Sequence, residues 1–100
     1  MYPPMVVSEQ VVAEQVGDEL VLLDLRSENF VALNEVAAVV WRSLEAHGSQ
    51  ERAASDVVSM FGVDRSVATE DVAELIADLV EMGLVERRSV ETQGIAAARS

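Results

Sequence analysis

The period of the hydrophobic pattern changes at Asn34, and this change constrains the fold more than any other feature of the chain. Before Asn34, short runs rich in β-branched residues and leucine alternate with turn residues, which predicts strands over 11–16, 19–25 and 29–33. After Asn34, apolar residues recur at spacings of three and four, which predicts three helices. The sequence therefore predicts an α+β domain in which a strand layer precedes the helices.

Capping residues indicate where the three helices begin and end. Asn34 can cap the first helix and Ser49 the second, and either Asp64 or Ser66 can cap the third. Each helix is expected to end at a glycine, and these are Gly48, Gly62 and Gly83. The resulting order, an N-terminal three-stranded antiparallel sheet followed by three helices, matches a winged helix-turn-helix.

The length of the chain supports a single domain. A last short strand is predicted at 84–86, so we assign the domain to residues 1–88 and expect the small, polar tail at 89–100 to be flexible. The apolar runs are too short to cross a bilayer, and the N-terminus lacks the basic and apolar pattern of a secretory signal. We therefore expect a cytoplasmic protein without a membrane partner.

The chain carries a formal net charge of -11 and contains no lysine. A protein that binds nucleic acid needs a basic surface to displace counterions from phosphates, so no nucleic-acid partner is expected. A winged-helix DNA-binding regulator is the alternative that the predicted fold raises. However, the third predicted helix has Arg65 at its start and acidic residues thereafter. The charge favours basic or neutral partners instead.

The sequence lacks the residue combinations that catalysis or metal binding would require. It contains no cysteine and one histidine, His47, which at a helix C-terminus is expected to interact with the helix dipole. No glycine-rich phosphate loop is present, and no serine has the context of a nucleophile. We therefore expect a protein that is not an enzyme and that has no cofactor and no metal.

The acidic residues of the third predicted helix have two interpretations. Five of them follow helical spacing, namely Glu70, Asp71, Glu74, Asp78 and Glu81. The simpler interpretation is a charged, solvated helix face. The alternative is that Asp71, Glu74 and Asp78 flank a groove and attract a basic peptide. The aromatic residues Trp41, Phe30 and Phe61 are expected to pack in the core rather than to contact a ligand.

The edge of the predicted sheet is a candidate binding surface. If the second and third strands pair, the strand at 29–33 keeps one side that the hairpin does not satisfy. Such an edge is either covered by the protein's own chain or extended by a strand from a partner. The pattern of residues alone leaves both possibilities open, because the N-terminal segment or the wing could cover the edge instead of a partner.

Several stretches of the sequence resemble one known family. These are LLDL at 22–25, FVALNEVAAVVW at 30–41, VVSMFGVD at 57–64 and DVAELIADLVEMGLV at 71–85. In their order and spacing they are similar to the PqqD-like family, over about residues 19–86. This resemblance implies a recognition element for the precursors of ribosomally synthesised and post-translationally modified peptides, in which the precursor's leader segment is the partner.

The resemblance also implies where the leader would bind. In such domains the leader docks as an extra strand beside the third strand, in a groove walled by the third helix. The strand residues implied here are Glu28, Asn29, Phe30, Val31, Ala32 and Leu33. The helix residues implied are Val67, Asp71, Leu75, Asp78, Leu79 and Met82.

Within the family, an acidic free-standing domain of this length resembles the discrete recognition protein of a lasso-peptide pathway. Such a protein delivers the precursor to a leader peptidase and then to a cyclase. The nearest alternative is the peptide chaperone of the PQQ pathway, which partners a radical enzyme. A third possibility is a purely structural subunit of a larger enzyme, which would have no affinity for isolated short peptides.

Overall fold

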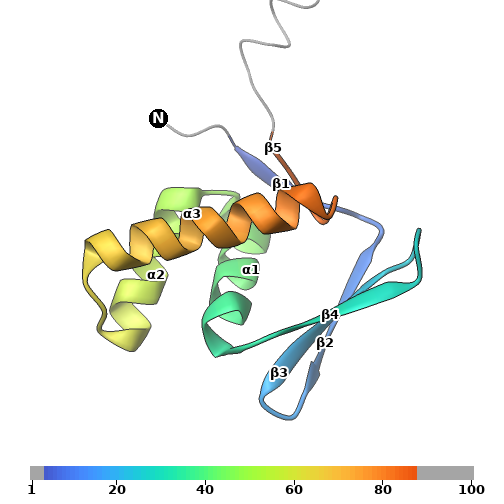
Figure 1. Ribbon diagram of the computed structural model, residues 1–100, viewed down its shortest axis with the longest axis horizontal. Coiled ribbons are helices and arrows are strands. Elements are labelled where there is room, and N and C mark those ends of the chain that lie inside the picture. Colours follow the sequence, from blue (N-terminus) through green and yellow to red (C-terminus); the bar gives the residue numbers. More distant parts are fainter. Residues whose placement is uncertain (1–3, 88–100) are drawn as a thin grey trace, which may run out of the picture.

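The computed structural model describes residues 4–87, which contain five strands and three helices (Figure 1). The tail expected to be flexible, 89–100, lies outside the described residues. In chain order, the elements are β1 (Met5–Val7), β2 (Val11–Val16), β3 (Glu19–Asp24), β4 (Asn29–Leu33), α1 (Glu35–His47), α2 (Gln50–Phe61), α3 (Arg65–Glu81) and β5 (Val85–Arg87).

The predicted three-stranded antiparallel sheet is confirmed, with the strand order β2-β3-β4. A turn at Gly17–Asp18 joins β2 to β3, and Gly17 has a φ of 59°, which glycine adopts without steric cost. In the second hairpin, Leu22 pairs with Val31 and Leu20 with Leu33. Because side chains alternate along a strand, these residues face the helices together. The α+β class predicted from the change of period at Asn34 is therefore confirmed.

A second, two-stranded sheet was not predicted. Strand β1 pairs antiparallel with β5, with Met5 opposite Arg87 and Val7 opposite Val85. The backbone N–H of Ser8 also donates to the carbonyl of Leu84 over 2.9 Å. The short last strand expected at 84–86 is thus found at Val85–Arg87. The N-terminal strand lies beside β5, and neither of these two strands pairs with β4.

The helix ends follow the predicted capping residues. The Asn34 side chain accepts a hydrogen bond from the N–H of Ala37 over 2.9 Å, and the Ser49 hydroxyl accepts one from Arg52 N–H over 3.1 Å. The residue that precedes α3 is Asp64, although its side chain makes no capping bond. Helices α1 and α2 end at the predicted glycines, whereas Met82 occupies the C-terminal cap of α3 one residue before Gly83.

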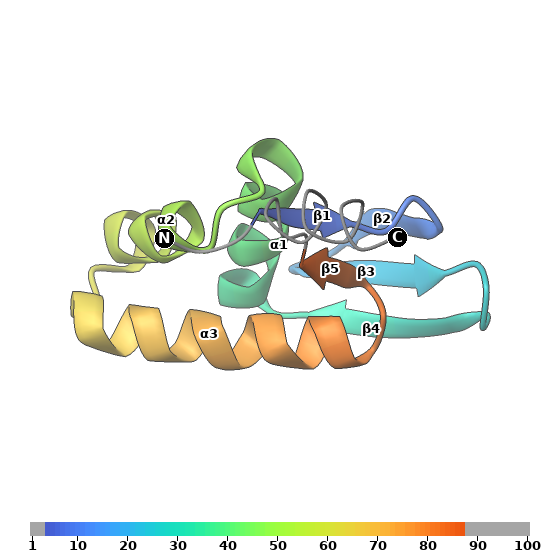
Figure 2. The ribbon, with the colours of Figure 1, turned by 90° about the horizontal axis from the view of Figure 1, so that it is seen from above.

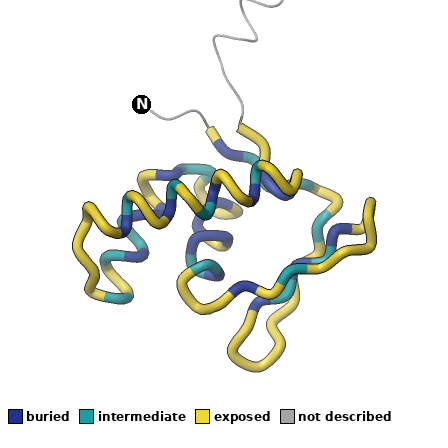
Figure 3. Tube along the Cα trace, in the orientation of Figure 1, coloured by how far each residue is buried: buried dark blue, intermediate teal, exposed yellow. Residues whose placement is uncertain are grey.

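The core lies between the three helices and the inner face of the sheet (Figure 3). Trp41 is almost completely buried in it, as predicted, and Phe61 packs against it. The expectation for Phe30 was wrong, since this side chain is 72% exposed. The reason is strand alternation: Phe30 pairs with Leu23 on the outer face of the sheet, while Val31 faces the helices.

The sheet contacts the helical part chiefly through α1, which packs on β3 and β4. In Figure 2 the C-terminal part of α3 overlaps β4, whereas Figure 1 shows the two elements separated, and the hairpins project beyond the helices. No helix within residues 4–87 is long and apolar enough to span a membrane. Residues 4–87 also contain no group of three or more histidine or acidic side chains arranged to hold a metal ion.

Candidate peptide-binding edge

The two-residue turn between β2 and β3 determines which backbone groups of the sheet are free. Val16 and Glu19 flank the turn Gly17–Asp18 and lie directly opposite each other. Opposite residues in an antiparallel pair alternate between hydrogen-bonded and non-hydrogen-bonded pairs. Val16 and Glu19 must be a hydrogen-bonded pair, because otherwise the next pair, Gly17 and Asp18, would have to bond each other although they are adjacent in the chain. The backbone groups of successive residues in a strand point to opposite sides. Glu19 bonds toward β2, so Leu20, Leu22 and Asp24 bond toward β4.

The alternation leaves the backbone of Phe30 and Ala32 without a partner strand. Leu22 pairs with Val31, so the N–H and C=O of Val31 bond to β3. The N–H and C=O groups of Phe30 and Ala32 therefore point to the other side of β4. Within residues 4–87, no strand pairs with this side, and no backbone hydrogen bond from another segment reaches it. The edge is thus available to a strand from another chain.

A groove lies beside this edge, between the sheet and the C-terminal end of α3. Its volume is about 300 Å³, at the lower end of the range of ligand pockets, so it holds one or two side chains rather than a whole peptide. The sheet supplies its floor and one wall, and the segment after α3 supplies the other wall. The lining residues are Leu22, Asp24, Ser27, Asn29, Val31, Met82 and Leu84.

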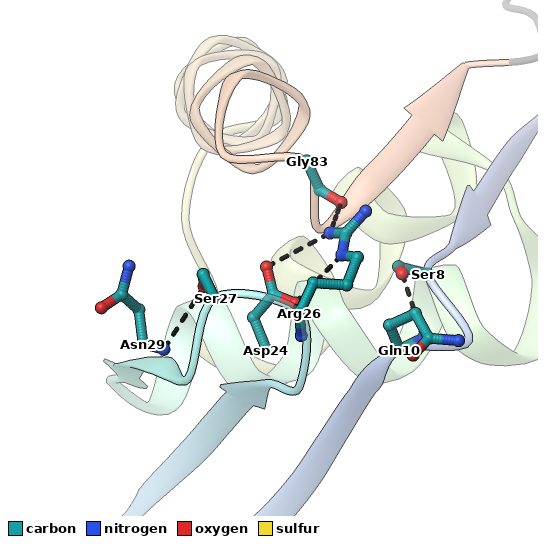
Figure 4. A network of polar contacts seen from close by, with 7 residues as sticks. All are labelled: Ser8, Gln10, Asp24, Arg26, Ser27, Asn29 and Gly83. Atoms are coloured by element: carbon teal, nitrogen blue, oxygen red, sulfur yellow. Dashed lines mark hydrogen bonds and ion pairs between the residues drawn. The ribbon is translucent and has the colours of Figure 1, made fainter.

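Asp24, one of the residues that line the groove, forms an ion pair with Arg26 (Figure 4). Arg26 Nε donates to Asp24 Oδ1 over 3.0 Å, and its terminal nitrogen donates to Oδ2 over 3.2 Å. The same terminal nitrogen donates to the carbonyl of Gly83 over 2.8 Å. The hydrogen bonds from Arg26 lower the pKa of the Asp24 carboxyl. Asp24 is therefore charged at neutral pH, and the stability that its charge contributes is lost only as the pH falls below the ordinary value of 3.8.

The structure places the implied β4 residues in three different environments. Asn29 and Val31 line the groove. Phe30 and Ala32 have exposed side chains on the outer face of the sheet and contribute backbone groups to the open edge. Leu33 is buried in the core. Glu28, at the start of this segment, is exposed and has a φ of 63°, a left-handed conformation that is uncommon for a side chain of this kind.

The implied α3 residues are spread along the whole helix. Met82, just after its last turn, lines the groove and is 45% exposed. Leu75 is partly buried against the core, and Asp71 and Asp78 are exposed. Val67 is exposed near the first turn of the helix, far along the chain from the groove. Leu79 has no exposed surface and is a core residue, so it does not line the groove.

Four residues that line the groove were not identified from the sequence: Leu22, Asp24, Ser27 and Leu84. Two of them could have been identified from the pairing of residues in the hairpin. Asp24 lies opposite Asn29, and Leu22 lies opposite Val31, so each shares a sheet face with a residue that the resemblance implied. Ser27 and Leu84 lie in connecting segments, where residue patterns do not determine the direction of a side chain.

Comparisons with solved structures find two related complexes. One is TbiB1 in complex with the TbiA(beta) leader peptide, with a TM-score of 0.76 and 26% sequence identity, covering 83% of this chain and 96% of that chain. The other is lasso peptide synthetase B1 complexed with the leader peptide, with a TM-score of 0.75 and 29% identity, covering 83% of this chain and 98% of that chain.

Comparisons of sequence give one match and one negative result. No curated protein is significantly similar to the chain. Residues 19–85 match the family described as "Coenzyme PQQ synthesis protein D (PqqD)". This match covers about two-thirds of the chain, from β3 to the start of β5, and includes the whole of the open edge. The chain belongs to the PqqD family.

Proposed function

We propose that this domain binds the leader segment of a ribosomally made precursor peptide by strand addition at β4. The observation that supports this most directly is the unpaired side of β4 next to a groove. The two related structures, which contain leader peptides, support it further. The acidic surface is compatible with a peptide partner that carries basic residues.

The geometry supports a mechanism of capture in which two kinds of contact act together. The free N–H and C=O groups of Phe30 and Ala32 would hydrogen-bond to the backbone of the guest and fix its register. Alternate guest side chains would then enter the groove beside Val31, and the others would lie on the outer face near Phe30.

The energetics of capture allow binding that is tight enough to be useful. Burial of roughly 300 to 500 Å² of apolar surface, at about 25 cal/mol per Å², contributes on the order of 10 kcal/mol. Most of this gain is offset by ordering a leader that is disordered when free and by the loss of translational freedom. Micromolar or tighter affinity is the expected net result.

We further propose that the protein acts without catalysis and delivers its peptide to separate modifying enzymes. One of the two related complexes is a lasso peptide synthetase B1 with a leader peptide, which favours delivery to a leader peptidase and a cyclase over partnership with a radical enzyme. Tethering the leader would keep the rest of the precursor near an active site at a high effective concentration. Because the precursor is made on ribosomes, we place this step in the cytoplasm.

The proposed function is tested with the leader of a precursor encoded beside the gene for this chain. Calorimetric titration of the chain with this peptide should give saturable binding of one leader per domain. In an NMR titration, the amide signals of Phe30 and Ala32 should shift, because their N–H groups gain partners. Absence of binding, or shifts confined to residues away from β4 and the groove, would contradict the proposal.

The exposed acids of α3 should speed the encounter with a basic leader. Reversal of two charges, in Asp71→Lys with Asp78→Lys, is expected to slow association several-fold at low salt while dissociation changes little. The difference should shrink as salt is added, because the Debye length falls from about 10 Å at 0.1 M to about 3 Å at 1 M. Stopped-flow fluorescence with a labelled leader measures both rates.

A matched control separates this local effect from the change in net charge. Glu45 in α1 and Glu51 in α2 are also exposed, and reversing both changes the net charge by the same amount. If Glu45→Lys with Glu51→Lys slows association as much as the α3 variant does, the overall charge of the protein accounts for the effect, and α3 has no special role.

A further inference from the structure

Arg26 connects the two walls of the groove. It lies in the turn between β3 and β4, where two of its nitrogens bond to the Asp24 carboxylate at the end of β3. From this position its terminal nitrogen also reaches the carbonyl of Gly83, which follows the C-terminal cap of α3. Figure 4 shows the guanidinium extending from the turn toward Gly83. One side chain therefore joins the sheet to the end of α3.

This connection matters because the groove walls belong to two different parts of the molecule. Asn29 and Val31 belong to β4, whereas Met82 and Leu84 lie in the segment after α3. The sheet packs on the helical part chiefly through α1, and α3 makes few backbone contacts with β3 or β4, so the packing of α3 on the sheet does little to fix the spacing between them. The Arg26–Gly83 hydrogen bond joins the turn that precedes β4 to the segment that follows α3, and so it restrains the spacing between them.

The chemistry of the contact suits it to holding a fixed distance. A guanidinium is planar, and its paired bonds to a carboxylate restrict its orientation more than a single ammonium contact would. The backbone N–H of Arg26 also donates to Asp24 Oδ1 over 3.0 Å, which ties both ends of the arginine to the same carboxylate. Gly83 has a φ of 79°, so its carbonyl is presented from a left-handed turn that favours glycine.

We propose that Arg26 is a positioning residue that sets the width of the groove before the peptide arrives. It does so by holding the end of α3 at a fixed spacing from β4. This inference rests on the proposed function and adds to it the residue that preorganises the site. A site already at its bound spacing loses less conformational freedom on binding, and this raises affinity without any contact between Arg26 and the guest.

The test compares Arg26→Gln and Arg26→Lys with the unaltered chain. Arg26→Gln removes the charge and the paired bonds, and its affinity for the neighbouring precursor's leader should fall about tenfold while the protein stays folded. Arg26→Lys keeps the charge but reaches Asp24 or Gly83 with a single ammonium group, so its affinity should stay below that of the unaltered chain. Arg52→Gln, on the exposed surface of α2, removes the same charge away from the groove and should bind normally.

A second measurement needs no peptide and reports on positioning itself. Nitrogen-15 relaxation dispersion should show new microsecond-to-millisecond exchange at the amides of β4 and of Met82 to Leu84 in Arg26→Gln, but not in Arg52→Gln. Normal leader affinity in Arg26→Gln would overturn the inference and leave the proposed function intact. Weaker affinity without any added exchange would also overturn it, since Arg26 would then act by direct contact.

If the unaltered chain itself failed to bind the leader, this result would contradict the proposed function and also the proposal that Arg26 prepares the groove for a peptide. The relaxation measurement distinguishes the two failures. Added exchange in Arg26→Gln would still show that this side chain holds the sheet and α3 together. Unchanged relaxation would remove that role as well.

Discussion

Ala32→Pro is expected to reduce affinity for the leader about 100-fold or more while the domain remains folded. Ala32 is exposed, and its N–H points to the open side of β4. Proline removes this donor, and its ring occupies the space where the guest backbone would approach. The lost hydrogen bond is worth roughly 1 kcal/mol, and the steric block accounts for the rest of the roughly 2.7 kcal/mol that a 100-fold change requires. Calorimetric titration measures the affinity, and circular dichroism reports folding.

The opposite edge of the same sheet provides a matched control. Ala13 in β2 is also exposed, and because Val12 and Glu14 bond toward β3, the N–H of Ala13 also points outward. Proline is tolerated on edge strands when its nitrogen faces solvent, so Ala13→Pro should fold and bind normally. If the two variants bound the leader equally well, the guest would not be adding to β4.

A third substitution distinguishes the two sides of β4. The N–H of Val31 donates to β3, so Val31→Pro breaks a hydrogen bond within the sheet itself. This variant is expected to be less stable than Ala32→Pro in urea denaturation. Loss of peptide binding in Val31→Pro alone would therefore report damage to the sheet rather than a blocked edge.

Gly48→Ala is expected to lower the free energy of unfolding by about 3 kcal/mol, for two reasons that combine at this position. Gly48 has a φ of 62°, where a residue with a Cβ is strained. A Cβ built at Gly48 would also lie 2.6 Å from the carbonyl oxygen of Met5, so β1 would have to move. Met5 is buried, and its N–H donates to the Gly48 carbonyl over 2.8 Å. Urea denaturation followed by tryptophan fluorescence measures the change.

Gly62→Ala isolates the part of this effect that comes from backbone strain. Gly62 ends α2 in the same way that Gly48 ends α1, and its φ is 67°, but nothing lies within 4 Å of a Cβ placed there. The variant should therefore lose only about 1 kcal/mol, from backbone strain. Equal losses in the two variants would show that the clash between a Cβ at position 48 and β1 adds nothing to the destabilisation.

The elements that the sequence predicts well are those specified by local chemistry. The caps at Asn34 and Ser49 and the stops at Gly48 and Gly62 act within one helical turn, so neighbouring residues determine them. The hairpin strands have the alternating pattern and the turn residues that sheets require. The open edge of β4 followed from the expected pairing together with the family resemblance.

Features that depend on contacts between distant residues were not predicted. Strand β1 has three residues, and it forms only because β5, about 80 residues later, supplies a partner. The exposure of Phe30 depends on the register of the hairpin, which determines the face on which each side chain lies. Asp24 and Leu84 line the same groove, and Arg26 bonds to the carbonyl of Gly83, although no local pattern of residues indicates these contacts.

The antiparallel pairing of β1 with β5 has a consequence for joining this domain to other proteins. Met5 lies opposite Arg87, so the polypeptide enters and leaves the described domain at neighbouring points. Both points lie on the side away from the projecting hairpins in Figure 1. An enzyme joined directly to either end of residues 4–87 would therefore be attached at nearly the same place, and neither fusion would need to cross β4. Circular permutants that connect these ends and open the Gly17–Asp18 turn would keep the guest edge intact.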